Sequence, residues 1–255
     1  MQRTYQTQAI VLNIHPAGEN NSTVTLLTSD KGIIYGTLYG GPKSKLKSLL
    51  SLWNSGIIYL YDNPEKNQTK ICDFDVKNYH VSFSENLFKF YAASLAAEIA
   101  IKTHCGGSNE ECFKLVAGFL DGMELSKEEE SRIGLVRFLW RYLELLGVQP
   151  DATCCSHCEA SFLTSEFALT SQCHYNERDN DFICEDCSSG SSENTPLQFM
   201  SVRYLAGISL LKPAEARLLQ ISKSSFEELR NFVFWLLQKT IEVKLNTLET
   251  GLGIL

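Results

Sequence analysis

The hydrophobic pattern of the chain changes its period near residue 84, and this change limits the possible folds more than any other feature. Residues 1–80 contain five short runs rich in β-branched and aromatic residues, each bounded by turn formers. From Ser84 on, apolar residues recur at helical spacing. A block of strands followed by a block of helices is typical of an α+β protein. We therefore expect one domain over residues 1–80 and a second over residues 81–255.

The five strand-like runs predict a small β-barrel. They cover residues 8–14, 22–28, 33–39, 56–62 and 69–80. Five short strands joined by tight turns favour an OB-fold, and an SH3-like barrel is the alternative. In the last run, Ile71, Phe74 and Val76 are the expected core residues.

The remainder of the chain predicts a mostly helical domain. Ser84-Glu85 is the expected start of the first helix. Further helices are expected over residues 110–123, 126–147, 199–211, 213–219 and 225–245, and a loop is expected over 189–198. The helix over 126–147 opens with acidic residues and closes on Gly147, as helix-end preferences require. Its stripe of apolar residues from Ile133 to Leu146 is expected to lie in the core.

Two cysteine pairs interrupt the helical part. Cys155 and Cys158 form one C-x₂-C pair, and Cys184 and Cys187 form a second. This spacing lets both sulfurs of one turn reach a single ion, and two such turns provide the four-sulfur shell that Zn²⁺ accepts. The gap between the pairs is longer than in compact zinc fingers, and a hairpin over residues 166–176 would absorb it. We expect one structural Zn²⁺ per chain in a subdomain of residues 154–190.

Other uses of these cysteines fit the sequence less well. A thioredoxin-type centre requires one C-x₂-C within a βαβ pattern, which is missing here. A structural disulfide is unusual in the cytosol, and a catalytic zinc site needs an open position with His or carboxylate ligands. Alternative ligands are Cys154, Cys173, His157 and His174, each of which is more typical of a bystander; His157 is expected to face solvent.

A lysine-bearing segment, GGPKSKLKSLLSLW at residues 40–53, is the second informative stretch. If the segment is extended, Lys43, Lys45 and Lys47 share one face. Lysines beside aromatic residues on a barrel are the elements of a single-strand nucleic-acid site. A solvated loop beside core aromatics is the alternative. Trp53 fits a core residue better than a stacking residue.

Charge is unevenly distributed along the chain. Residues 1–80 carry eight Lys/Arg and six Asp/Glu, whereas residues 81–255 carry fifteen and twenty-four, which together give the net charge of −7. An acidic total argues against a simple nucleic-acid coating protein. With no apolar stretch of membrane-spanning length and no secretory signal pattern, we expect a cytoplasmic protein without a membrane partner.

The order of these motifs resembles the RecO family of bacterial recombination mediators. The resemblance runs through residues 8–32, 40–53, 90–100 and 137–151 and the cysteine pair that follows, and it extends to about residue 240. It implies an N-terminal OB domain and a helical domain with a four-cysteine zinc site. Two departures bear on the strength of DNA binding: three lysines stand where the family is often richer in arginine, and the helical part is acidic.

The resemblance implies a non-enzymatic mediator of the RecF pathway. Such proteins bind single- and double-stranded DNA, anneal complementary strands, and load RecA together with RecR and the single-strand-binding protein. The resemblance also implies a nucleoid-associated location, and it assigns DNA binding to the domain that carries Lys43, Lys45 and Lys47. Two other functions compete with this one. A zinc hydrolase lacks support, because the sequence has no HExxH, phosphate loop or G-x-S-x-G motif. A protein-only adaptor, whose barrel and acidic helical domain bind protein partners, is compatible with the charge.

Overall fold

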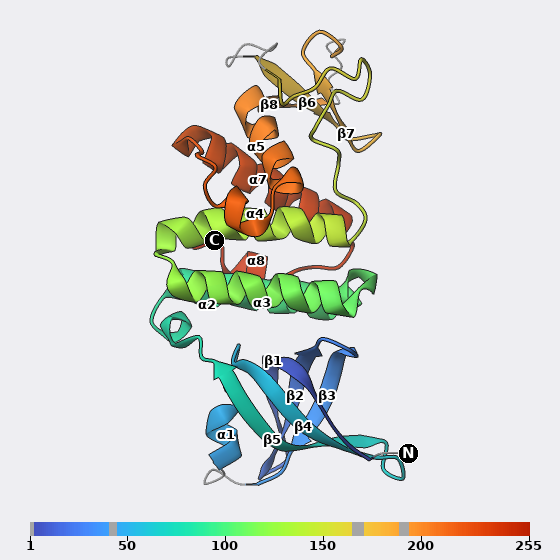
Figure 1. Ribbon diagram of the computed structural model, residues 1–255, viewed down its shortest axis with the longest axis vertical. Coiled ribbons are helices and arrows are strands. Elements are labelled where there is room, and N and C mark those ends of the chain that lie inside the picture. The colour runs from blue at the N-terminus through green and yellow to red at the C-terminus, as the bar shows by residue number, and fades with distance from the viewer. Residues whose placement is uncertain (1–2, 41–44, 165–170, 189–193) are drawn as a thin grey trace. The chain divides into compact units, whose positions relative to one another are not determined.

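The computed structural model describes residues 3–40, 45–164, 171–188 and 194–255 (Figure 1). Its contacts divide the chain into two compact units. The first unit is Met1–Leu135 together with Val243–Leu255, and the second is Val136–Glu242. The proposed domain boundary at residue 80 and the limits of the cysteine subdomain stay predictions.

Five strands of the first unit close into a barrel (Figure 1). They are β1 (Thr4–Ala17), β2 (Asn21–Thr28), β3 (Gly32–Leu38), β4 (Ser55–Asn63) and β5 (Gln68–Asn78). Their order around the barrel is β1-β2-β3-β5-β4. Neighbouring strands are antiparallel except β3 and β5, which run parallel where Gly36 pairs with Thr69 and Thr37 with Lys70. The predicted five-stranded barrel and the α+β class are confirmed.

Strand β1 is longer than the sequence predicts. His15, Pro16 and Ala17 had the composition of a turn, but they continue the ladder with β2. The register shifts between Val11 and Asn13, and such an irregularity bends a strand. A bent β1 can pair with β2 along one part and with β4 along another, which allows the barrel to close.

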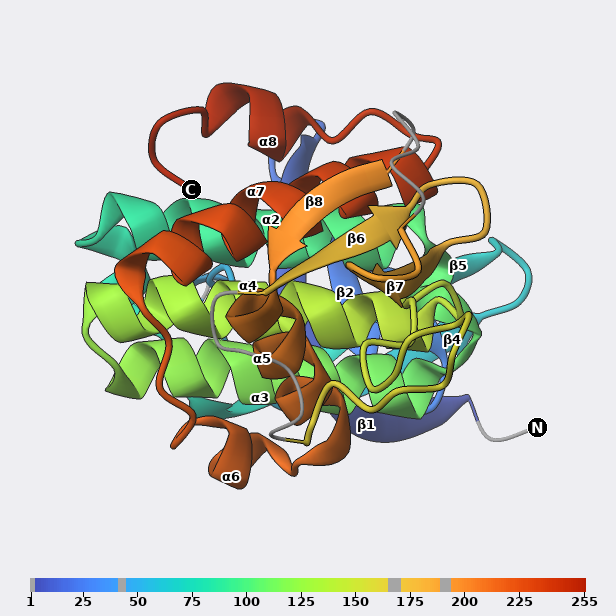
Figure 2. The same ribbon diagram turned by 90° about the horizontal axis from the view of Figure 1, so that it is seen from above.

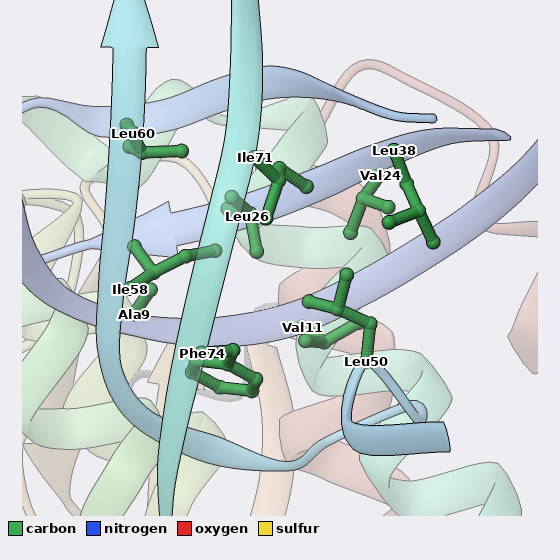
Figure 3. Close-up of a cluster of buried hydrophobic side chains, with 10 residues drawn as sticks. All are labelled: Ala9, Val11, Val24, Leu26, Leu38, Leu50, Ile58, Leu60, Ile71 and Phe74. Atoms are coloured by element: carbon green, nitrogen blue, oxygen red, sulfur yellow. The ribbon is translucent and has the colours of Figure 1, made fainter. Parts of the chain in front are cut away.

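The barrel interior is filled by side chains from all five strands (Figure 3). Successive strand residues point to opposite faces, so alternate positions enter the core. Ile71 and Phe74 are buried there and Val76 packs at the margin, as expected. Leu50, which follows the short helix α1 (Lys45–Leu49), joins the same cluster. Helix α1 therefore packs its leucines against the barrel core.

Helices complete the first unit. They are η1 (Val81–Ser84), α2 (Leu87–Lys102), η2 (His104–Gly107), α3 (Asn109–Leu125), the start of α4 (Glu128–Leu145) and α8 (Asn246–Thr250). Helices α2 and α3 lie side by side (Figures 1 and 2). The expected helix start at Ser84-Glu85 is wrong: Ser84 ends a 3₁₀ turn, and the Asn86 side chain caps α2 by accepting the Lys89 N–H at 2.9 Å. This cap satisfies an amide that the helix start leaves unpaired.

Helix α4 ends as its sequence predicts. Gly147 has φ +72°, and the Val148 N–H donates to the Leu143 carbonyl at 3.0 Å. This is the glycine-dependent helix end, because glycine adopts the left-handed conformation without strain. In the apolar stripe of α4, Val136, Phe138, Leu139, Tyr142 and Leu143 are buried.

The second unit combines a small sheet with helices. Its elements are β6 (Gln172–Asn176), β7 (Asp181–Cys184), β8 (Asn194–Gln198), α5 (Phe199–Leu210), α6 (Pro213–Ala216) and α7 (Lys223–Thr240). Strand β6 lies between β7 and β8 (Figure 2).

Four sequence expectations for the second unit need correction. Residues 194–198 form β8 instead of a loop, because they pair with β6. Strand β6 lies within the predicted hairpin range of residues 166–176, but it pairs with β7 beyond that range; residues 166–170 lie outside the described residues. Helices α6 and α7 end before the predicted residues 219 and 245.

Candidate metal centre and nucleic-acid interface

The four predicted cysteine ligands meet at one place in the second unit. The sulfurs of Cys155, Cys158, Cys184 and Cys187 all lie within 4.8 Å of one another. Cys184 ends β7, which places it beside the first cysteine pair: its backbone N–H donates to the Cys155 sulfur at 3.3 Å. The β6–β7 hairpin thus brings together two pairs that are distant in sequence.

Local turns aim the sulfurs of each pair inward. The Cys155 carbonyl accepts from the Glu159 N–H at 2.9 Å, and the Cys184 carbonyl accepts from the Cys187 N–H at 3.2 Å. Glu159 has φ +61°, which reverses the chain after Cys158. The Ser156 N–H donates to the carbonyl of Phe182 in β7 at 2.9 Å, and this bond ties the first turn to the hairpin.

The spacing of the sulfurs fits a tetrahedral metal shell. Four sulfurs at about 2.3 Å from a central Zn²⁺ lie about 3.8 Å apart along each tetrahedral edge. Cys158 Sγ and Cys184 Sγ are 3.8 Å apart. None of these four cysteines forms a disulfide, so their sulfurs remain available to a metal ion. The four-cysteine cluster could therefore hold one metal ion.

The thiols of the four-cysteine cluster differ in pKa. Burial raises the pKa of the Cys155 thiol, but N–H groups of Cys184, Cys158 and His157 outweigh burial and lower it to about 7. Hydrogen bonds with Cys184 and Cys158 raise the pKa of Cys187 to about 12. Crowded thiols resist losing their protons together because thiolates repel one another. A bound cation removes that repulsion, which is the chemistry expected of a metal site.

The alternative ligands stay outside the cluster. Among the residues that the structure describes, Cys154, Cys173, His157 and His174 are not part of the metal-competent group. Burial raises the pKa of the Cys173 thiol to about 12, which keeps it protonated. His157 is exposed, as expected for a residue between two ligands.

Part of the lysine segment is helical. Lys43 lies outside the described residues, whereas Lys45 and Lys47 are exposed on helix α1. An extended chain, the condition under which the lysines would share one face, does not hold for residues 45–49, because Leu46 and Leu49 pack on the barrel core from one side of a helical turn. Residues two apart on an α-helix are separated by about 200° around the helix axis, so their side chains point in nearly opposite directions. Lys45 and Lys47 therefore do not share one face.

Both lysines remain available to a ligand. Neither Lys45 nor Lys47 forms an ion pair among the described residues. Lys47 lines a cavity of about 560 Å³ in the first unit, whose walls include Trp53, Tyr79 and Phe90. The described lining residues include no carboxylate.

Trp53 is a core residue, as the sequence favoured. Its side chain is 5% exposed, and its ring meets Phe90 edge-on with the centroids 5.1 Å apart. Its φ of +64° is unusual for a residue with a side chain. Hydrogen bonds hold this conformation: the Trp53 N–H donates to the Val11 carbonyl at 2.7 Å, and its carbonyl lies 2.8 Å from His80 Nδ1. A buried ring in this position cannot stack on a base.

Sequence reasoning gave less weight to the exposed tyrosines of β3. Tyr35 is 58% exposed and Tyr39, just beyond the end of β3, is 43% exposed. Across the parallel contact with β5, Lys70 pairs with Thr37, and its Nζ lies 5.8 Å from the centroid of the Tyr39 ring. Strand alternation in residues 33–39 is the sequence signal that could have placed these tyrosines on the outer face.

Comparison with known proteins agrees with this architecture. The model of the recombination protein O N-terminal domain matches residues 1–78, and the model of its C-terminal domain matches residues 84–249. The DNA repair protein RecO of Thermodesulfovibrio yellowstonii is 28% identical over 240 residues, covering 90% of each chain. The RecO of Bacillus subtilis is 24% identical over 236 residues, covering 87% of this chain and 88% of its own.

The chain combines a closed five-stranded barrel, a set of helices and a cluster of four cysteines that could hold a metal ion. Together with the similarity to repair proteins, these features define the class as an α+β DNA repair protein. Within that class, the chain belongs to the RecO family, because the two family models together match most of its length. Its role therefore lies in DNA repair and recombination. Among the described residues, no helix has the length and apolar character needed to cross a membrane.

Proposed function

We propose that this chain is a non-enzymatic mediator that binds single- and double-stranded DNA through its barrel. It anneals complementary strands and assists RecA loading together with RecR and the single-strand-binding protein. It acts in the cytoplasm, at the nucleoid. Membership of the RecO family is the observation that carries this proposal.

The lysines of the barrel supply the contacts to phosphate. Lys45 and Lys47 are exposed and lack ion pairs among the described residues, so their charges are free to meet DNA. We include Lys43 from its place in the same segment. Because α1 turns Lys45 and Lys47 apart, the two side chains contact different phosphates instead of one.

We further propose that the four-cysteine cluster binds one structural Zn²⁺ per chain. The ligands are Cys155, Cys158, Cys184 and Cys187. Four thiolates leave no open coordination position, which suits a structural site and leaves no place for a substrate. The ion holds the two cysteine-bearing turns and the β6–β7 hairpin together. Its binding energy stabilises the fold of this part of the chain.

The DNA proposal is tested by titrating labelled oligonucleotides with the full chain over a series of salt concentrations. Each phosphate contact contributes about 0.7–0.9 to the slope of log K against log salt. The triple change Lys43→Ala, Lys45→Ala and Lys47→Ala should weaken binding to all sequences and flatten the slope by about two. A matched triple change of exposed lysines elsewhere, at Lys127, Lys212 and Lys223, alters the net charge equally and should leave the slope unchanged.

Two outcomes would count against the proposal. If the triple variant keeps the wild-type slope and annealing, the lysine segment is not the DNA site. If the wild-type chain shows no salt-dependent binding to either kind of DNA, the barrel is that of a protein-only adaptor, which the net charge of −7 permits.

A further inference from the structure

The outer face of β3 changes character along its length. Gly36 faces the interior, where an added Cβ would lie 2.7 Å from Ile71, so the neighbouring Tyr35 and Thr37 face outward. At the start of the strand, η2 contacts β3 and Ile33 is half-buried. Further along the strand, Tyr35 is 58% exposed. The barrel thus presents two large rings to solvent, one at the middle of β3 and one just beyond its end.

Strand alternation places Tyr39, one residue beyond the end of β3, on the same side as Tyr35. Tyr35 and Tyr39 are four residues apart, so strand geometry separates them by about 13 Å. Thr37 lies between them and carries no ring. Each tyrosine can therefore present one aromatic surface to a separate planar group.

Hydrogen bonds orient the second ring. The Tyr39 hydroxyl donates to Gln68 Oε1 at 2.7 Å, and Gln68 Nε2 donates to Thr37 Oγ1 at 3.0 Å. This relay crosses from β3 to β5 and fixes the direction of Tyr39 before any ligand arrives. A ring that is already positioned loses less conformational entropy when it binds.

A cation lies beside the rings. Lys70 Nζ is 5.8 Å from the Tyr39 ring centroid, and Lys70 forms no ion pair among the described residues. Exposed rings with an adjacent cation are the combination that binds single-stranded nucleic acid: the ring stacks on a base and the cation meets the backbone phosphate. Base faces in a duplex are already stacked, so the rings favour unpaired bases.

We propose that Tyr35, Tyr39 and Lys70 form a stacking platform that makes the barrel prefer single-stranded over duplex DNA. This proposal rests on the proposed function and deepens it. The lysines of the α1 segment contact phosphate in either kind of DNA, whereas the platform determines the preference between them.

The test compares a labelled oligothymidylate with a duplex of equal length, using the full chain over a salt series. The double change Tyr35→Ala and Tyr39→Ala should lower single-strand affinity at least about 10-fold, because each stacked base contributes about 1–3 kcal/mol and 1.4 kcal/mol is tenfold. Duplex affinity and both salt slopes should stay unchanged, because no charge is removed. Lys70→Ala should instead flatten the single-strand slope by about 0.7.

Two further variants separate stacking from general damage. Tyr35→Phe keeps the ring and should bind like the wild type. Leu125→Ala removes a large apolar side chain that is 87% exposed at the end of α3, and it should also bind like the wild type. Unchanged single-strand affinity in the double variant would overturn the platform, as would an equal loss on duplex DNA. A wild-type chain that binds no DNA would overturn the proposed function itself.

Discussion

His80 and Asp121 link the segment after the barrel to helix α3: His80 Nε2 lies 2.9 Å from Asp121 Oδ1. Nδ1 on the other side of the ring lies 2.8 Å from the Trp53 carbonyl. Only 1% of the His80 side chain is exposed. One side chain thus connects the loop before β4, the residues after β5 and helix α3, all within the first unit.

Replacing His80 with alanine should destabilise the chain by about 1–3 kcal/mol. The change leaves the Trp53 carbonyl without its imidazole partner, and unsatisfied buried polar groups carry a cost of this size. Urea unfolding followed by circular dichroism measures the effect. His15→Ala is the matched control, because His15 is exposed on β1 and should cost almost nothing. Equal midpoints for both variants would show that the His80 contacts add no stability.

Chelation or loss of one cysteine should release the proposed ion. Metal analysis of protein purified without added zinc should give about one equivalent of Zn²⁺ per chain. Cys155→Ser should abolish zinc binding and lower the melting temperature, because metal-binding energy is partly folding energy. Cys72→Ser changes an exposed thiol on the barrel and should preserve both values. Metal-free protein as stable as the wild type would refute a structural role for zinc.

Gly56→Ala should be severely destabilising. An added Cβ at Gly56 would lie 2.1 Å from the Asp75 carbonyl oxygen, which is backbone and cannot rotate away. Relieving this clash would require separating β4 from β5, so we expect the free energy of unfolding to fall by more than about 3 kcal/mol. Gly118→Ala in α3 meets nothing within 4 Å and should stabilise the chain by up to about 1 kcal/mol. Thermal unfolding of the two variants provides the comparison, and a mild effect at Gly56 would contradict the packing described.

Glu98 should contribute stability that is lost in acid. Burial raises the pKa of this carboxyl, but hydrogen bonds from Lys102 and from the N–H groups of Thr247 and Asn246 outweigh burial and lower it below 4.5. Because the folded value is lower than the unfolded one, the contribution is present above pH 4.5 and disappears as the pH falls through the folded pKa.

A pH series of urea unfolding curves tests this assignment. Glu98→Gln should lower stability near neutrality and lose less stability than the wild type on acidification. Glu110→Gln removes an exposed carboxylate that pairs with Lys114 one turn further along its own helix, and it should change little. If the free energy of unfolding of wild type and Glu98→Gln changes with pH in parallel, Glu98 does not contribute to the loss of stability in acid.

Features set by short-range chemistry could be predicted from the sequence. Turn formers between β-branched runs determine the barrel strands, and the C-x₂-C spacing determines which four sulfurs converge. Both signals span only a few residues, so they do not depend on where the rest of the chain lies.

Features that depend on register or tertiary packing could not be predicted. Helix α1 has five residues, too few to display a helical period, and it forms because Leu46 and Leu49 meet the barrel core. Strand β8 exists only because β6 offers it a partner. Strand alternation can place Tyr35 on the face of β3 opposite Ile34 and Leu38, but tertiary packing decides whether other elements cover that face, and local sequence does not report this.

The first unit is discontinuous in sequence, and this has a consequence for synthesis. Helix α8 lies after the whole of Val136–Glu242, yet its first N–H groups, on Asn246 and Thr247, donate to Glu98 at 2.9 and 2.8 Å. A ribosome adding about 5–20 residues per second needs roughly 5–20 s to pass through that intervening segment. During this interval the nascent first unit lacks its last piece, and the face of α2 that receives α8 is open to the cell.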